Sequence, residues 1–364
     1  MHKTSAWPLA LIYLGLICYA SLYPFTGWRD QGIMPWTFIT SPLSPYWTGF
    51  DVGINILGYM PFGFLLVLIA LRTGHARYGL VFAPLAAGIL SLAMESLQSY
   101  LPLRVSSNLD LGLNILGAGL GALLAWAMKK IGGLEHWSRF RARWFVTEAR
   151  GGLVLLAMWP LALLFPATVP FGLGQVFERF EGVLPDALAG TPFLDWLPTQ
   201  TIKLQPLVPD VELICVALGV LIPCLLGFCI IRSITRRALF LILVFVLGIS
   251  VTALSSALSY GPEHAWAWFS LPTKAGLVVA LGLGISMLWV PQRPSAALVL
   301  LALGIYLGLL NQVSASPYFA QTLATWEQGR FIRFHGLAQW LGWLWPYAVL
   351  VYVLMQISSR KPKN

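Results

Sequence analysis

Carboxylate and amide side chains recur four residues apart in the N-terminal third of the sequence. Asp51 and Asn55 form one such pair, and Asp110 and Asn114 form another. Residues four apart share one face of a helix, so each pair would present a carboxylate beside an amide. A carboxylate accepts hydrogen bonds and an amide both donates and accepts them, so these faces are suited to binding a polar ligand.

A third polar face lies between the two pairs. Glu95 and Gln98 are three residues apart, and a short loop carrying Arg104 leads from them to Asp110. We therefore expect one polar pocket, in which Glu95, Arg104 and Asp110 approach one another closely enough for direct or water-bridged contact. Its predicted lining is Asp51, Asn55, Glu95, Gln98, Arg104, Ser106, Ser107, Asp110 and Asn114.

The elements that must position these side chains are membrane-spanning helices. The chain has 364 residues, of which 58% are hydrophobic and 10% charged, and its mean hydropathy is +0.75. Apolar runs near the length of about 20 residues that a helix needs to cross a bilayer recur throughout. About ten are predicted, at 7–23, 52–71, 78–101, 109–128, 152–169, 213–231, 238–258, 271–290, 296–311 and 337–357. The predicted fold class is an all-α, polytopic helical membrane protein.

Basic residues predict the orientation of these spans. Seven of the 23 fall in loops on one side, and the remaining 16 (23 less seven) fall on the other. The seven are Arg29, Arg104, Arg179, Lys203, Lys274, Arg330 and Arg333. Because positive loops stay in the cytoplasm, both termini are expected on the cytoplasmic side. The membrane is expected to be a bacterial inner membrane, and the polar pocket is expected to face outward from it. The net charge of +9 then reflects topology, and no nucleic-acid partner is expected.

An internal repeat underlies the two polar pairs. Residues 51–58 (DVGINILG) align with residues 110–117 (DLGLNILG), and each copy opens a predicted span. A Ser-x-x-Pro sequence precedes each copy, at 21–24 and 99–102, so the unit is a duplicated helix hairpin. Parallel repeats of this kind predict a pseudo-two-fold axis along the membrane normal, with Asp51 equivalent to Asp110.

The polar positions resemble those of the VanZ-like family. The similar residues are Glu95-x-x-Gln98, Pro102-x-Arg104, Ser107 and Asp110-x-x-x-Asn114-x-x-Gly117-x-x-x-Gly121, preceded by Asp51-x-x-x-Asn55 and Pro61-x-Gly63. The resemblance covers roughly the first third of the chain. It implies a link to teicoplanin resistance and the cell envelope, without implying a reaction.

The resemblance and the polar pocket together leave several functions open. The favoured one is binding or handling of a lipid-linked or peptidoglycan-related headgroup, with membrane lipids as the other partners. An intramembrane enzyme would use Glu95 or Asp110 as general base and Arg104 as an electrophilic clamp. A transporter or flippase is a further alternative, and so is a polar network that only fixes helix packing. No metal or cofactor motif is found, and none is expected.

Three regions are expected along the chain. Residues 1–128 form the four-span VanZ-like part, 129–150 a basic linker or interfacial helix, and 151–364 a six-span part. Aromatic residues near 137–144 at helical spacing indicate a helix on an anionic leaflet, and a solvated topology anchor is the alternative. In the loop before the last span, Arg330, Arg333 and His335 are candidate contacts for an external headgroup, and aromatic-belt anchoring is the alternative.

Overall fold

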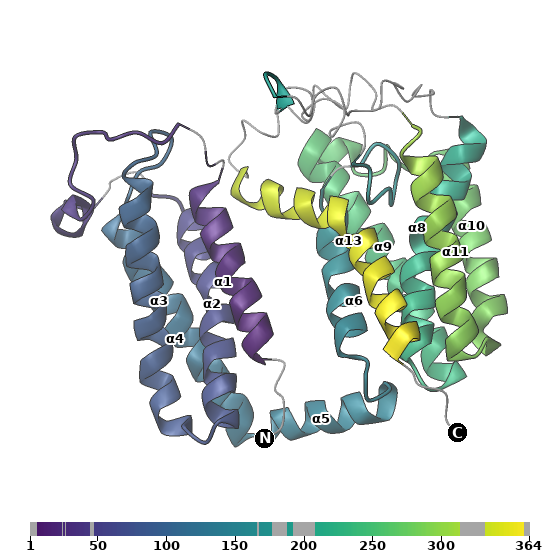
Figure 1. The fold of residues 1–364 in the computed structure, drawn as a ribbon, viewed down its shortest axis with the longest axis horizontal. Coiled ribbons are helices and arrows are strands. Elements are labelled where there is room, and N and C mark those ends of the chain that lie inside the picture. The colour runs from purple at the N-terminus through teal and green to yellow at the C-terminus, as the bar shows by residue number, and fades with distance from the viewer. Residues whose placement is uncertain are drawn as a thin grey trace. The chain divides into compact units, whose positions relative to one another are not determined.

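The computed structural model describes residues 6–23, 25, 27–43, 47–165, 167–176, 188–191, 208–313 and 332–359. Most of these residues are in helices. The α-helices are α1 (Ala6–Leu22), α2 (Gly49–Arg72), α3 (Ala76–Gln98), α4 (Asn108–Lys130), α5 (Gly133–Trp144), α6 (Arg150–Leu163), α8 (Pro209–Ile230), α9 (Ile234–Tyr260), α10 (Leu271–Ser286), α11 (Gln292–Leu310) and α13 (Ile332–Ser359). Short 3-10 helices are η1 (Thr37–Thr40), η3 (Pro262–His264) and η4 (Met287–Trp289). Figure 1 shows these helices along the chain.

Every predicted span coincides with a helix, but two of the helices are shorter than a full membrane span. Eight helices among the described residues are long and apolar enough to cross a membrane, whereas α1 has 17 residues and α6 has 14. The prediction for 152–169 was too long, because α6 ends at Leu163. Phe165 precedes a proline, and the residue before a proline is disfavoured in the helical conformation. The protein is thus a polytopic helical membrane protein, and its described residues contain eight full-length candidate spans and two shorter apolar helices.

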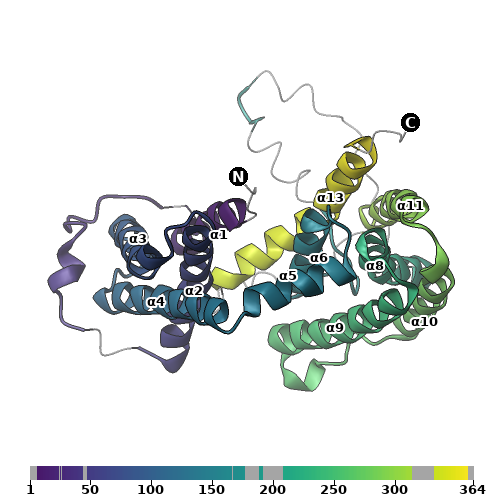
Figure 2. The same cartoon turned by 90° about the horizontal axis from the view of Figure 1, so that it is seen from below.

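The chain divides into two compact units, Met1–Phe140 and Arg141–Asn364. In the first unit α2 packs against α1, α3 and α4, as the view along the helices in Figure 2 shows. Glycines allow α2 and α4 to approach with their backbones in contact. A Cβ on Gly117 would collide with the carbonyl of Ile56, and a Cβ on Gly121 with that of Met60. Small residues at such positions let membrane helices pack closely.

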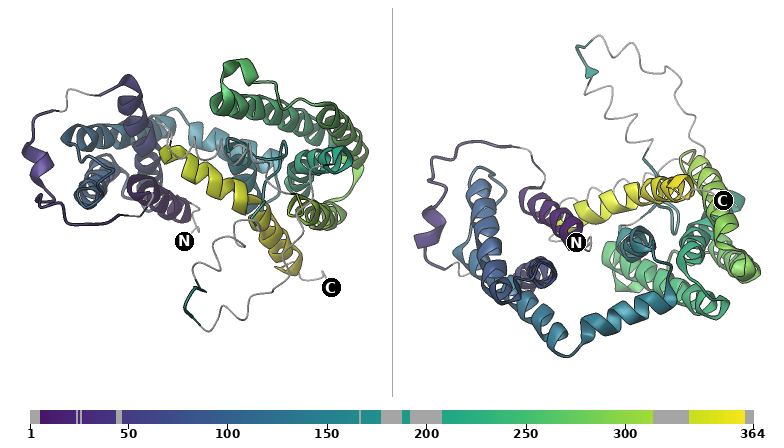
Figure 3. Two further views of the ribbon diagram at one scale, coloured as in Figure 1. Left: turned by 90° about the horizontal axis from the view of Figure 1, so that it is seen from above. Right: turned by 60° about the horizontal axis from the view of Figure 1, so that its bottom comes forward.

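In the second unit α8 is the central helix. It packs against α6, α9, α10 and α11, and Figure 3 shows these neighbours around it from two further directions. Its residues from Cys215 to Ile230 are buried apart from Leu218. The cysteines at 215, 224 and 229 are therefore buried as free thiols in an apolar helix.

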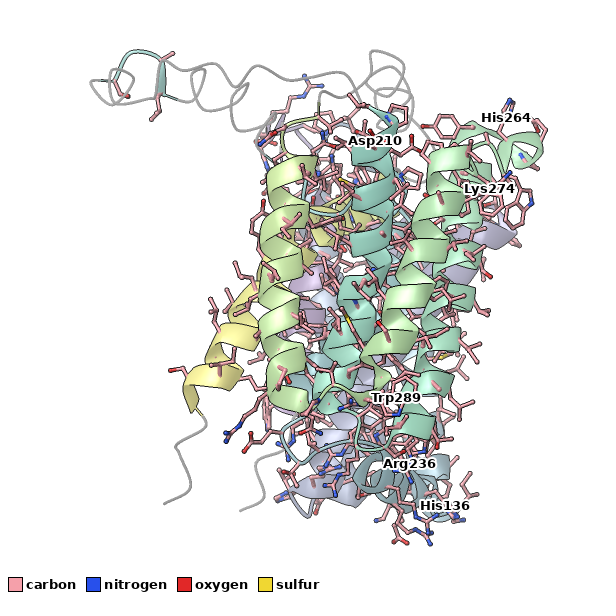
Figure 4. The ribbon with its side chains drawn as sticks, turned by 90° about the vertical axis from the view of Figure 1, so that its right-hand side faces the viewer. His136, Asp210, Arg236, His264, Lys274 and Trp289 are labelled. Carbon is pink, nitrogen blue, oxygen red and sulfur yellow. The ribbon has the colours of Figure 1, made fainter. Side chains whose placement is uncertain are left out.

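Arg237 holds together one end of this second unit. Its guanidinium is buried and donates to the carbonyls of Phe228, Leu288 and Val290 at 2.8, 3.0 and 2.6 Å. These carbonyls lie near the ends of α8 and η4, where helical partners are missing, so Arg237 caps both. Figure 4 shows Arg236 and Trp289 at this end of the unit and Asp210, His264 and Lys274 at the other.

Candidate functional site

The two copies of the repeat begin their helices with the same cap. The Thr48 hydroxyl accepts from the Asp51 amide in α2 at 3.2 Å, and the Ser107 hydroxyl accepts from the Asp110 amide in α4 at 3.4 Å. A serine or threonine cap with an acid three residues later satisfies the open amides of a first helical turn. The repeat thus has a structural counterpart at both helix starts. That the whole hairpins superpose by rotation about the membrane normal stays a prediction.

The two aspartates nevertheless form different side-chain contacts. Asp51 is exposed and completes its own capping box, accepting from the Thr48 amide at 3.0 Å. Asp110 is half-buried, and its Oδ1 accepts from the amide of Asn55 at 2.8 Å. The Asn55 to Asp110 bond joins α2 to α4 and brings the starts of these helices to the same end of the unit. Asp51 therefore lies at the rim of the candidate site, and Asp110 lies within it.

Glu95 accepts the second hydrogen bond of the cap that begins α4. Its side chain is 4% exposed, and its Oε2 accepts from the Ser107 amide at 2.8 Å. The Ser106 hydroxyl also donates to the backbone carbonyl of Glu95 at 2.6 Å. In α2 the backbone amide of the cap residue Thr48 donates to Asp51 of the same helix. In α4 the corresponding amide of Ser107 donates to Glu95, which belongs to α3. A carboxylate at a helix N-terminus is also favoured by the helix dipole.

The side chains of Arg104 and Gln98 cap the C-terminal end of α1. The Arg104 guanidinium donates to the carbonyls of Tyr23 and Ala20 at 2.6 and 3.4 Å, and the Gln98 amide donates to that of Ser21 at 2.9 Å. The last carbonyls of a helix lack partners within it and carry its negative dipole end, so a cation is favourable here. A direct or water-bridged contact of Glu95 with Arg104 or Asp110 stays a prediction.

Two residues that the sequence analysis overlooked, Tyr59 and Ser91, extend the polar cluster inward. Asn114 is 4% exposed and its Nδ2 donates to the Ser91 hydroxyl at 2.9 Å. Tyr59, from α2, is 6% exposed, with Ser91 and Glu95 as polar neighbours of its hydroxyl. Helical spacing could have revealed both residues, because Tyr59 lies four positions after Asn55 and Ser91 four before Glu95.

Oδ1 of Asn114, a buried polar atom in this cluster, has no hydrogen-bond partner in the described part of the chain. The hydroxyl of Tyr59 interacts with Ser91 without the geometry of a full hydrogen bond. A buried polar group without a partner costs about 1–3 kcal/mol, so native proteins seldom retain one. An atom from outside the protein that donates to Asn114 or pairs with Tyr59 would remove this cost.

The structure thus brings together most of the predicted polar residues, from α2, α3, α4 and the loop before α4. The predicted external contacts Arg330, Arg333 and His335 fall in the second part of the chain, Arg141–Asn364. Arg330 lies outside the described residues, and only the backbone is described at Arg333 and His335, in the first turns of α13. Their predicted role stays a prediction.

Comparison with known proteins places a family match on this same part of the chain. A model of the VanZ/LLP1 family matches residues 8–129, the N-terminal third of the 364 residues. The resemblance predicted from the spaced polar residues is thereby confirmed. The match contains α1 to α4 almost completely, and with them every residue of the polar cluster. No curated protein and no solved structure matches the chain.

Proposed function

We propose that the polar cluster of the first unit binds a component of the bacterial cell envelope. The observation that carries this proposal is the unpartnered buried Oδ1 of Asn114, in the same cluster as the buried carboxylate of Glu95 and a Tyr59 hydroxyl that lacks a well-formed hydrogen bond. A network that only fixed helix packing would satisfy its own buried groups, since unpaired ones destabilise the fold. An unpartnered acceptor beside a buried carboxylate supports a role for a ligand that completes the network.

The chemistry of these atoms suggests the class of ligand. Asn114 Oδ1 and Glu95 accept hydrogen bonds, and the Tyr59 hydroxyl can donate or accept one. Hydroxyl and amide groups, which are abundant in sugars and peptides, meet these requirements. Together with the VanZ/LLP1 match, this supports a lipid-linked or peptidoglycan-related headgroup as the ligand, and a role in glycopeptide resistance.

The proposed site faces outward from the bacterial inner membrane. Arg72 lies in the last turn of α2, and Lys129 and Lys130 in the last turn of α4, at the ends opposite to Asp51 and Asp110. Because basic residues favour the cytoplasmic side, the helix starts that carry the site would meet the periplasm.

Teicoplanin susceptibility of cells expressing variants at matched levels tests this function. Tyr59→Phe removes a hydroxyl that has no well-formed hydrogen bond within the described chain, so the protein should insert normally but lose resistance. The matched control is Tyr13→Phe, which removes a hydroxyl bonded to the Gly58 carbonyl at 2.9 Å and should retain resistance. Equal susceptibility in wild type, Tyr59→Phe and empty vector would contradict the proposal.

A further inference from the structure

The short helix α5 combines exposed aromatic rings with arginines. Trp137 and Phe140 are 55% and 40% exposed, and their rings stack with centroids 5.6 Å apart. A turn of about 100° per residue places Trp137, Phe140 and Trp144 in one stripe along the helix. On the same geometry Arg139 and Arg143 lie on one flank of the stripe and Arg141 on the other. An aromatic stripe between two basic flanks is typical of a helix at a membrane surface.

The short connections of α5 keep it close to a membrane edge. Only Ile131 and Gly132 separate it from α4, which is apolar and long enough to span the membrane. Gly132 adopts a positive φ of 72°, which a glycine tolerates and other residues rarely adopt, and this allows the sharp turn out of α4. Figure 3 shows α5 as a separate helix that follows this turn. A candidate span of this length would end at the membrane surface, and α5 would begin there.

Contacts within the second unit hold the other end of α5. Arg236, at the start of α9, donates to the backbone carbonyl of Arg143, and its guanidinium lies 5.5 Å from the centre of the Trp144 ring. The Arg232 amide donates to the carbonyl of Trp144 at 3.1 Å. The C-terminal end of α5 is therefore fixed beside the start of α9, another candidate span.

The arginines of α5 are available to an external anion. Among the described residues, no ion pair or hydrogen bond involves the side chains of Arg139, Arg141 or Arg143, and Glu135 is the one acid in the helix. Exposed cations next to a membrane edge attract anionic headgroups, and arginine matches the geometry of a phosphate. A solvated linker would not explain why two large aromatic rings lie between these cations.

We propose that α5 lies along an anionic lipid surface, with Trp137 and Phe140 at the boundary of headgroups and acyl chains and the three arginines of α5 against lipid phosphates. This inference does not depend on the envelope ligand proposed for the first unit. The partner is the lipid surface itself, because one end of α5 follows the candidate span α4 directly and the other end contacts the start of the candidate span α9. Lipid bound here would fix the position of α5 where the chain passes from one unit to the next.

Lipid titration of the full-length, detergent-solubilised protein tests the proposal. The probes are dioctanoyl-phosphatidylglycerol and dioctanoyl-phosphatidylcholine, with bound lipid measured by native mass spectrometry. Wild type should bind the anionic lipid more tightly. Arg139→Gln with Arg143→Gln should weaken this binding about 30-fold, which is about 2 kcal/mol at 1.4 kcal/mol per factor of ten.

Two further pairs of variants separate lipid binding from folding and from net charge. Arg139→Lys with Arg143→Lys keeps the charge and should keep most of the affinity. Arg72→Gln with Arg293→Gln removes two exposed charges outside α5 and should leave the affinity near that of wild type. Inorganic phosphate at the same concentration should not compete. Equal affinity for both lipids, equal effects of the two Gln pairs, or competition by phosphate would each overturn the proposal.

Discussion

At the level of residues, the candidate site is a set of polar pairs at helical spacing. Three helices each contribute one pair: Asn55 and Tyr59 from α2, Ser91 and Glu95 from α3, and Asp110 and Asn114 from α4. Each pair is joined to another helix or to a cap by the bonds described above. The site is thus assembled from side chains that lie far apart in sequence but on facing sides of three packed helices.

Glu95 should stabilise the fold mainly as a hydrogen-bond acceptor. Glu95→Ala leaves the Ser107 amide without its acceptor and should lower the free energy of unfolding by about 1–3 kcal/mol, whereas Glu95→Gln retains an acceptor oxygen and should lose about 1 kcal/mol or less. Thermal unfolding in detergent measures the difference. Glu135→Ala, at an exposed carboxylate, serves as the control. Equal destabilisation by Ala and Gln would show that the charge itself stabilises the fold.

The identity of the site residues was partly predictable from the sequence. Ionisable residues in apolar segments identified Glu95 and Asp110, since such groups are costly in a membrane. Tyrosine and serine are common in membrane spans, so the residue types at 59 and 91 did not point to a site. Their helical spacing from Asn55 and Glu95 did. The sequence also could not distinguish Asp51 from Asp110, because the two motifs are alike. Their contacts differ through Glu95, which belongs to another helix.

At the level of elements, close packing of α2 on α4 brings the polar residues of these two helices together, as in the bond from Asn55 to Asp110. Gly117→Ala should destabilise the protein by about 1–3 kcal/mol, because the added methyl group would collide with the backbone of Ile56. Gly119→Ala is a matched control in the same helix, since nothing lies within 4 Å of a Cβ there. Thermal unfolding of both variants tests the contact. A Gly117→Ala protein as stable as Gly119→Ala would show that the helices are further apart than described.

The helices themselves were largely predictable, because apolar runs of spanning length are long and strongly patterned. Each of the ten predicted segments is helical, and the main error was the end of α6. The contact between α2 and α4 was only suggested by Gly117 and Gly121. Glycines at this spacing allow a close approach, but the partner helix follows from the tertiary packing.

At the level of the whole molecule, the sidedness of the membrane spans decides whether the site meets the periplasm. A reporter enzyme active only in the periplasm should be silent when fused after Lys130, where α4 ends, and active when fused after Gly261, which follows α9. The expected pattern follows from the excess of basic residues on the predicted cytoplasmic side. The reverse pattern would place the polar cluster toward the cytoplasm.

The central claim is that an envelope component occupies the cluster around Glu95, Tyr59 and Asn114. Mass spectrometry of the lipids and glycans that copurify with the full-length protein tests it most directly. Wild type and Tyr13→Phe should retain a hydroxyl- or amide-bearing envelope component. Tyr59→Phe should retain about fivefold less, since one hydrogen bond contributes about 1 kcal/mol, and Glu95→Ala should retain less still. The same copurifying molecules in the same amounts from all four proteins would contradict the claim.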